Sequence, residues 1–110
     1  MVPLTLQAHA TADGPLIAAG GALDYETAQD FHDLLRTVVL LPGQHLSVNL
    51  EGVEFFDSSG VRALLAARNL AISAEAGLVL IATPGHVVRV LDALGLQEPF
   101  GTGSPPPRAS

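Results

Sequence analysis

A short polar segment in the middle of the chain carries the side chains that could do chemistry. Asp57, Ser58, Ser59 and Gly60 follow one another and supply one carboxylate, two hydroxyls and a glycine. Carboxylates and hydroxyls accept hydrogen bonds from the unpaired N–H groups in the first turn of a helix. In α/β proteins, the junction between a strand and the next helix is also where binding sites gather. The segment therefore caps a helix, carries a function, or does both.

Two kinds of catalytic residue do not fit this segment. A hydrolase nucleophile needs glycine two residues before and two residues after the serine, but Phe56 and Asp57 stand two residues before Ser58 and Ser59. A phosphate-accepting Asp57 would be similar to that of a receiver domain, a family that also uses an acidic pair for Mg²⁺ and a lysine. The chain has no lysine and no acidic pair after its first predicted strand. We therefore expect that the protein is not an enzyme.

Cofactor and metal sites are also not indicated. The pair Gly20-Gly21 has neither the dinucleotide-binding spacing nor the phosphate-loop spacing of glycines. The histidines are scattered without the paired spacing of metal ligands; they are His9, His32, His45 and His86. We expect no cofactor and no metal.

Serine phosphorylation is the chemistry that remains. A phosphate on a serine at a helix start meets unpaired N–H groups and the positive end of the helix dipole. It adds a charge of about −1.5 to −2. Beside Asp57, this charge would prevent docking onto a partner surface built for a neutral hydroxyl. On the residues alone, a capped helix without further function is the simpler interpretation.

Composition limits the class of protein and of partner. A chain of 110 residues with 48% hydrophobic content predicts one small domain with a single core. The N-terminus lacks the positive charge of a secretory signal, and no apolar run approaches the roughly 20 residues of a membrane span. The absence of cysteine suits a cytoplasmic protein. A net charge of −6 argues against nucleic acid and anionic membranes, and leaves a protein partner with a basic face.

Hydrophobic patterning places the polar segment between a strand and a helix. Alternation predicts strands at 4–8 and 16–19, joined as a hairpin, with the segment Gly20-Gly21-Ala22-Leu23 breaking the pattern after the second. Asp24 is predicted to cap a first helix whose apolar stripe reaches Val38. A strand at 46–50 leads to a second helix that starts at Asp57 or Ser58 and ends at Gly77.

The remaining chain continues the alternation of strands and helices. A strand is predicted at 78–82, followed by a third helix with Thr83 as its cap, Pro84 at its first position and Gly95 at its end. A short strand is expected at 96–100, and 101–110 is predicted to be a disordered tail. The fold class is α/β, with a mixed, mostly parallel sheet of four to five strands, an N-terminal hairpin, and helices after the second, third and fourth strands.

The segment from Leu46 to Val61 resembles the core motif of STAS domains, and more narrowly that of bacterial anti-sigma-factor antagonists. Residues 21–24 are similar to the family's Gly-x-Leu-Asp sequence at the first helix, and 90–96 to the end of its penultimate helix. The resemblance covers about 4–100, so residues 1–100 are predicted to form one STAS-like domain. Two positions depart from the pattern: Ala22 replaces a common acidic residue, and Arg62 adds a cation after the motif.

The resemblance implies a regulatory cycle in transcription. The unphosphorylated protein would bind an anti-sigma factor with serine kinase activity and so release a sigma factor. The kinase would phosphorylate Ser58, the complex would dissociate, and a serine phosphatase would reset the protein. The partner-binding residues implied are Asp24, Asp57, Ser58, Ser59 and Gly60, and Arg62 is added to them as a cation suited to an acidic patch on the partner. The alternative is a STAS subunit of a lipid-transport or stress-sensing assembly, acting as a scaffold without phosphorylation.

Overall fold

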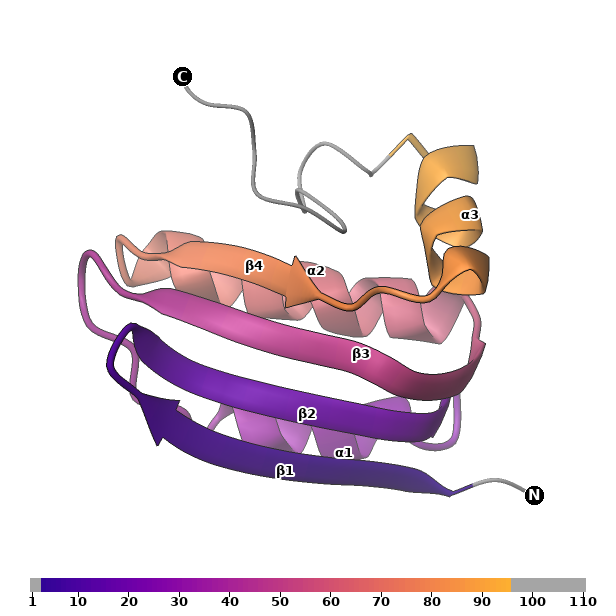
Figure 1. Cartoon of the computed structure of the whole chain (residues 1–110), viewed down its shortest axis with the longest axis horizontal. Coiled ribbons are helices and arrows are strands. Elements are labelled where there is room, and N and C mark those ends of the chain that lie inside the picture. Colours follow the sequence, from indigo (N-terminus) through magenta and orange to yellow (C-terminus); the bar gives the residue numbers. More distant parts are fainter. Residues whose placement is uncertain (1–2, 96–110) are drawn as a thin grey trace.

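Four strands form one sheet in the order β1-β2-β3-β4, and helices follow the last three of them (Figure 1). The structure is a computed structural model that describes residues 3–95. Its elements are β1 (Leu4–Thr11), β2 (Gly14–Leu23), α1 (Ala28–Leu35), β3 (His45–Phe56), α2 (Ser58–Ser73), β4 (Gly77–Ile81) and α3 (Gly85–Ala93). This order confirms the predicted succession of strands and helices.

The sheet is mixed and mostly parallel, as predicted. β1 pairs with β2 in an antiparallel hairpin, whereas β2 with β3 and β3 with β4 are parallel pairs. Because the last three strands are parallel, their carboxyl ends lie at the same edge of the sheet. The expected strand at 96–100 and the expected tail at 101–110 lie outside the described residues.

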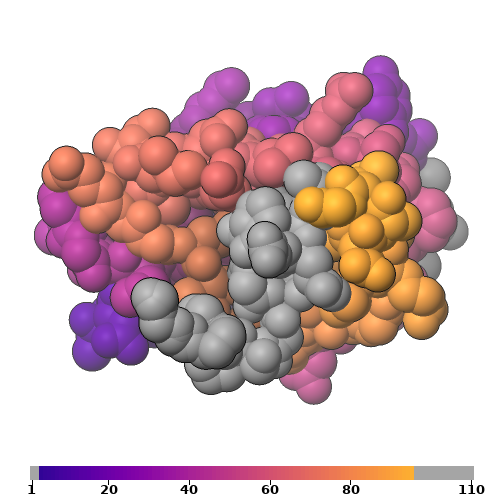
Figure 2. Space-filling view, turned by 90° about the horizontal axis from the view of Figure 1, so that it is seen from above, coloured from indigo at the N-terminus to yellow at the C-terminus, as the bar shows by residue number. Residues whose placement is uncertain are grey.

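The core lies between the sheet and the helices that cover one of its faces. Along β3, Leu46, Val48 and Leu50 are fully buried, while the residues between them point to the other face. α1 and α2 lie side by side across the buried face, and α3 lies past the β4 edge at the end where α2 begins (Figures 1 and 2). Phe31 of α1, Leu64 of α2 and Leu91 of α3 are each fully buried.

β2 and β3 are both longer than predicted. The prediction that Gly20-Gly21 break the second strand was wrong, because β2 continues to Leu23 and β3 to Phe56. The glycines permit a close approach: a Cβ on Gly20 would lie 2.9 Å from Oγ1 of Thr5, and one on Gly52 would lie 3.2 Å from Cα of Gly20. The register of the β2–β3 pairing shifts twice in this region, between Ala18 and Gly20 and between Gly21 and Ala22.

The helix ends also correct the predictions. α1 ends at Leu35, before Val38. α2 ends at Ser73 rather than at Gly77. Its last carbonyls are satisfied because the N–H of Ala76 bonds to the carbonyl of Ala71 (2.8 Å) and that of Glu75 to Ile72 (3.0 Å). This is a Schellman end in which Glu75, with φ of 59°, takes the left-handed position that glycine usually fills.

α3 lacks the predicted hydroxyl cap. It begins at Gly85 after Pro84, and no side chain caps it. The hydroxyl of Thr83 is buried and has no hydrogen-bond partner within residues 3–95, so the prediction of Thr83 as the cap was wrong. Gly95, with φ of 70°, follows the helix end as predicted. No helix within residues 3–95 has the length and hydropathy needed to cross a bilayer.

Candidate functional site

The sheet register brings Asp24 and Asp57 to the same place. Leu23 and Phe56 are paired at the carboxyl ends of β2 and β3, and each aspartate directly follows the last residue of its strand. Both then begin the turn toward a helix on the buried face of the sheet. The structure thus gathers at one edge two aspartates that lie far apart in the sequence.

Asp57 is the residue of the polar segment that caps α2. Its backbone is extended (φ of −130°), and its carboxylate accepts hydrogen bonds from the N–H groups of Ser59 (2.8 Å) and Gly60 (3.4 Å). These are two of the N–H groups that a helix start leaves unpaired. A negative side chain here is also favoured by the positive end of the helix dipole. Asp57 therefore holds the junction in place.

Ser58 is the first residue of α2, and its side chain is exposed. The side-chain hydrogen bonds at this junction are those accepted by Asp57, and the Ser58 hydroxyl makes none to the described part of the chain. Capping and the accessible hydroxyl are therefore on different residues. The question left open by the sequence is answered: Asp57 caps the helix, and Ser58 has no structural role in the cap.

Gly60 is buried where α2 packs against the ends of β2 and β3. A Cβ at this position would lie 2.6 Å from Cε1 of Phe56 and 3.0 Å from the carbonyl oxygen of Leu23. Only glycine allows the first turn of α2 to come this close. Since Leu23 directly precedes Asp24, the same contact sets the turn at Asp24 against the start of α2.

Asp24 organises the turn that leads into α1. Its carboxylate accepts hydrogen bonds from the N–H groups of Glu26 (3.0 Å) and Thr27 (3.1 Å). In return, the Thr27 hydroxyl accepts from the N–H of Asp24 (3.0 Å) and donates to the carbonyl of Ala22 (2.7 Å). This reciprocal arrangement is a capping box. Asp24 thus caps the turn before the helix, whereas α1 itself begins at Ala28 with Thr27 at its N-cap position and no side-chain cap bond there, so the prediction of Asp24 as the helix cap was wrong.

An open hollow of about 520 Å³ lies beside this junction, and we call it the motif hollow. Ser59 and Arg62 line it from α2, while Tyr25 and Glu26 line it from the turn before α1. Tyr25 is 83% exposed although it is aromatic. Sequence reasoning missed Tyr25, even though it is the single tyrosine of the chain and directly follows Asp24. Exposed tyrosine and arginine are enriched where protein partners dock.

The predicted site residues therefore divide into two groups. The first group supports the local structure: Asp24 and Asp57 accept hydrogen bonds from nearby main-chain N–H groups, and Gly60 allows close packing. The second group lies at the surface: Ser58 is exposed on α2, and Ser59 and Arg62 line the motif hollow. Within residues 3–95, no three side chains of His, Cys, Asp or Glu come together as a metal site would require. The junction presents hydroxyls and charges on its surface, as a binding surface does.

A family model described as "Mlab, STAS domain" matches residues 6–102 of the chain. The chain belongs to the STAS domain family. This agrees with the resemblance of its core motif and with the observed order of strands and helices. No curated protein matches the chain in sequence.

Two solved structures share the fold of this STAS domain. An anti-sigma factor antagonist from Mycobacterium paratuberculosis is 21% identical, with a TM-score of 0.70, over 88% of this chain and 82% of that one. The anti-sigma factor antagonist SpoIIAA in its unphosphorylated form is 20% identical, also with a TM-score of 0.70, over 87% of this chain and 85% of that one. At this identity, the likeness establishes the fold of the STAS domain.

Proposed function

We propose that this STAS domain is an anti-sigma-factor antagonist, a cytoplasmic binding protein rather than an enzyme. Its unphosphorylated form binds an anti-sigma factor with serine kinase activity and thereby releases a sigma factor. Phosphorylation of Ser58 by that partner ends the complex, and a serine phosphatase restores it. The two solved antagonists of the same fold support this assignment.

One observation carries the proposal: Ser58 is exposed at the start of α2, while the cap bonds among the described residues are both accepted by Asp57. A kinase can reach the hydroxyl without opening the fold, and a phosphate there removes no hydrogen bond from the helix. The modification changes mainly the charge of the surface. A regulatory site that leaves the fold intact requires this separation of roles.

Phosphorylation of Ser58 would add more negative charge to the junction than either of its two aspartates carries. A phosphate of about −1.5 to −2 would stand next to the carboxylate of Asp57 and at the edge that also carries Asp24. A partner surface that accepts a neutral hydroxyl would have to desolvate this added charge without a compensating cation. We therefore expect the phosphorylated form to dissociate.

The site is tested by incubating the protein with ATP and its candidate anti-sigma kinase and measuring the intact mass. Wild type and Ser59→Ala should each gain one phosphate, whereas Ser58→Ala should gain none. Ser59→Ala is the matched control because it removes the neighbouring hydroxyl. Phosphate on Ser58→Ala at the wild-type level would remove the assignment of the site.

The charge mechanism is tested by the affinity for the same partner. Ser58→Asp should weaken binding at least about tenfold, or about 1.4 kcal/mol. An unchanged affinity, together with no phosphorylation of the wild type, would favour the alternative of a scaffold subunit in a lipid-transport or stress-sensing assembly. The description of the family model names Mlab and no antagonist, so this alternative belongs in the test.

A further inference from the structure

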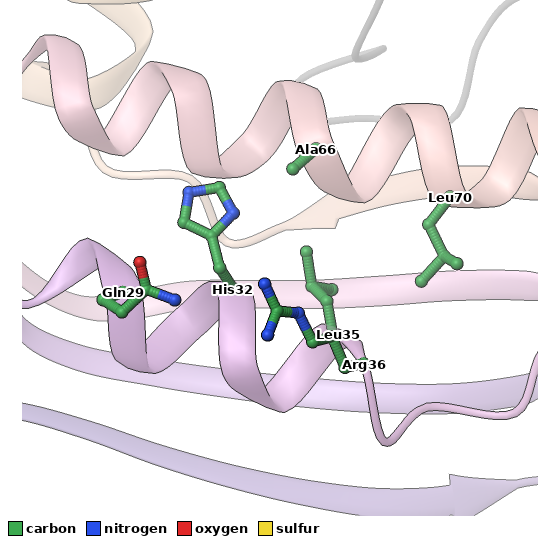
Figure 3. Close-up of a pocket in the computed structure, with 6 residues that line it drawn as sticks. All are labelled: Gln29, His32, Leu35, Arg36, Ala66 and Leu70. Atoms are coloured by element: carbon green, nitrogen blue, oxygen red, sulfur yellow. The ribbon is translucent and has the colours of Figure 1, made fainter.

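The motif hollow is one end of a longer groove between α1 and α2. A second hollow of about 450 Å³ adjoins it, and the two share Gln29 and His32. Figure 3 shows the second hollow, with Leu35 at the end of α1 and Arg36 directly after it on one side, and Ala66 and Leu70 of α2 on the other. We call the two together the α1–α2 groove. It starts beside Ser59 and follows α2 away from the motif.

The groove has the length of a short helix. Its wall on α2 consists of Ser59, Arg62, Ala66 and Leu70, which are three or four residues apart and so lie along one face. At roughly 1.5 Å per residue, about 17 Å of helix separates Ser59 from Leu70. This length matches about three turns of a partner helix.

The lining combines an apolar floor with cations. Leu35, Ala66 and Leu70 supply the apolar surface, and Leu35 is almost fully buried. Arg62 stands at the motif end and Arg36 at the far end. The Arg36 side chain is 77% exposed, and its contact with Asp33 is long, at 3.9 Å. A surface ion pair of this kind contributes little and exchanges readily for another carboxylate.

The local charge is opposite to that of the whole chain. The protein has a net charge of −6, yet α2 holds two arginines and no carboxylate. Among the described residues that line the groove, Glu26 is the single carboxylate, against Arg36, Arg62 and the imidazole of His32. The basic partner face expected from the net charge therefore does not suit this surface.

We propose that the α1–α2 groove binds an acidic amphipathic helix of about three turns from the protein partner. Apolar side chains of that helix would pack on Leu35, Ala66 and Leu70, and its carboxylates would pair with Arg62 and Arg36. Helices commonly bind partners in this way, with an apolar face in a groove and charges at its rim. The inference rests on the proposed function only for the identity of the partner.

The proposal also connects the groove with Ser58. Ser58 and Arg62 are four residues apart on α2, so their side chains are neighbours on the helix surface. A phosphate on Ser58 attracts the guanidinium of Arg62 and competes with the carboxylates of the docked helix. Phosphorylation thereby weakens partner binding in the groove as well as around Ser58.

The first experiment measures the affinity of the full chain for its anti-sigma partner. Arg36→Glu, far from the motif, should weaken binding at least about tenfold. Arg89→Glu changes the net charge equally from an exposed position on α3, outside the groove, and should change affinity less than about twofold. The neutral Arg36→Gln should lie between wild type and Arg36→Glu. Equal losses for Arg36→Glu and Arg89→Glu would mean general charge repulsion and would overturn the proposal.

The second experiment needs no native partner. Two peptides of about 12 residues carry leucines at the same helical spacing and either glutamates or lysines beside them. The acidic peptide should shift the backbone amide signals of Gln29, His32 and Ala66 in the isotope-labelled chain, and the lysine peptide should not. If the anti-sigma partner does not bind but the acidic peptide does, the groove stands and the proposed function fails. Equal signal shifts with both peptides, or no shift with either peptide, would overturn the proposal that the groove binds an acidic helix.

Discussion

The replacement Gly60→Ala tests how closely α2 is held against the sheet. The new methyl group would lie 2.6 Å and 2.7 Å from two carbons of the Phe56 ring and 3.0 Å from the carbonyl oxygen of Leu23. Phe56 is only 7% exposed, so its ring cannot move into solvent, and Leu23 belongs to the main chain of β2. The contact can be relieved only if the first turn of α2 moves.

Two opposing effects set the expected magnitude. Extra volume in a packed core costs about 1–3 kcal/mol. Alanine in place of glycine returns up to about 1 kcal/mol of helix propensity, less in a first turn. The free energy of unfolding should therefore fall by about 1–2 kcal/mol, which corresponds to a fall in Tm of several degrees in a domain of this size.

Urea unfolding followed by circular dichroism measures this difference. The matched control is Gly85→Ala, at the first residue of α3, where a Cβ would lie at an ordinary 3.6 Å from Nη1 of Arg89. The control should stay within about 0.5 kcal/mol of wild type. Equal stabilities for the two variants, or a stabilised Gly60→Ala, would refute the argument that close packing requires glycine at this position.

Two further variants separate the roles of the neighbouring residues. Asp57→Ala should lower the free energy of unfolding by about 1 kcal/mol through loss of the cap, while Asp57→Asn keeps an acceptor oxygen and should lose less. Similar losses for both would show that the bonds from Ser59 and Gly60 are not the cause. Ser58→Ala should remain within about 0.5 kcal/mol of wild type in urea unfolding, because its hydroxyl supports no structure. A loss near that of Asp57→Ala would place Ser58 in the cap.

The succession of elements was predictable because each strand and helix carries its own hydrophobic period. A helix cap within the segment Asp57-Ser58-Ser59 followed from side-chain chemistry that acts within one turn, but the choice of Asp57 over the two serines did not. The full lengths of β2 and β3 could not be predicted from the sequence, because Gly20-Gly21 indicates a break when only neighbouring residues are considered. Pairing with β3 overrides that local preference, and the glycines allow the two main chains to approach closely.

The surface beside the motif was even less accessible to sequence reasoning. The α1–α2 groove joins Tyr25 from a turn, His32 from α1 and Arg62 from α2, and no spacing within one element relates these residues. At Thr83, by contrast, the sequence predicted a helix cap that the structure does not have. A hydroxyl before a proline predicts a helix cap locally, yet tertiary packing buries this hydroxyl without a partner among the described residues.

The separation of cap and hydroxyl determines what kind of switch the junction can be. If the serine itself capped α2, its phosphorylation would compete with the bonds that start the helix, and the signal would pass through local unfolding. Here Asp57 accepts both cap bonds, so we expect these bonds to remain when Ser58 is phosphorylated. The register of Leu23 with Phe56 fixes the position of that cap within the sheet. If Ser58 is phosphorylated as we propose, the modification should act through surface charge, and its effect on partner binding should weaken as salt concentration rises and screens that charge.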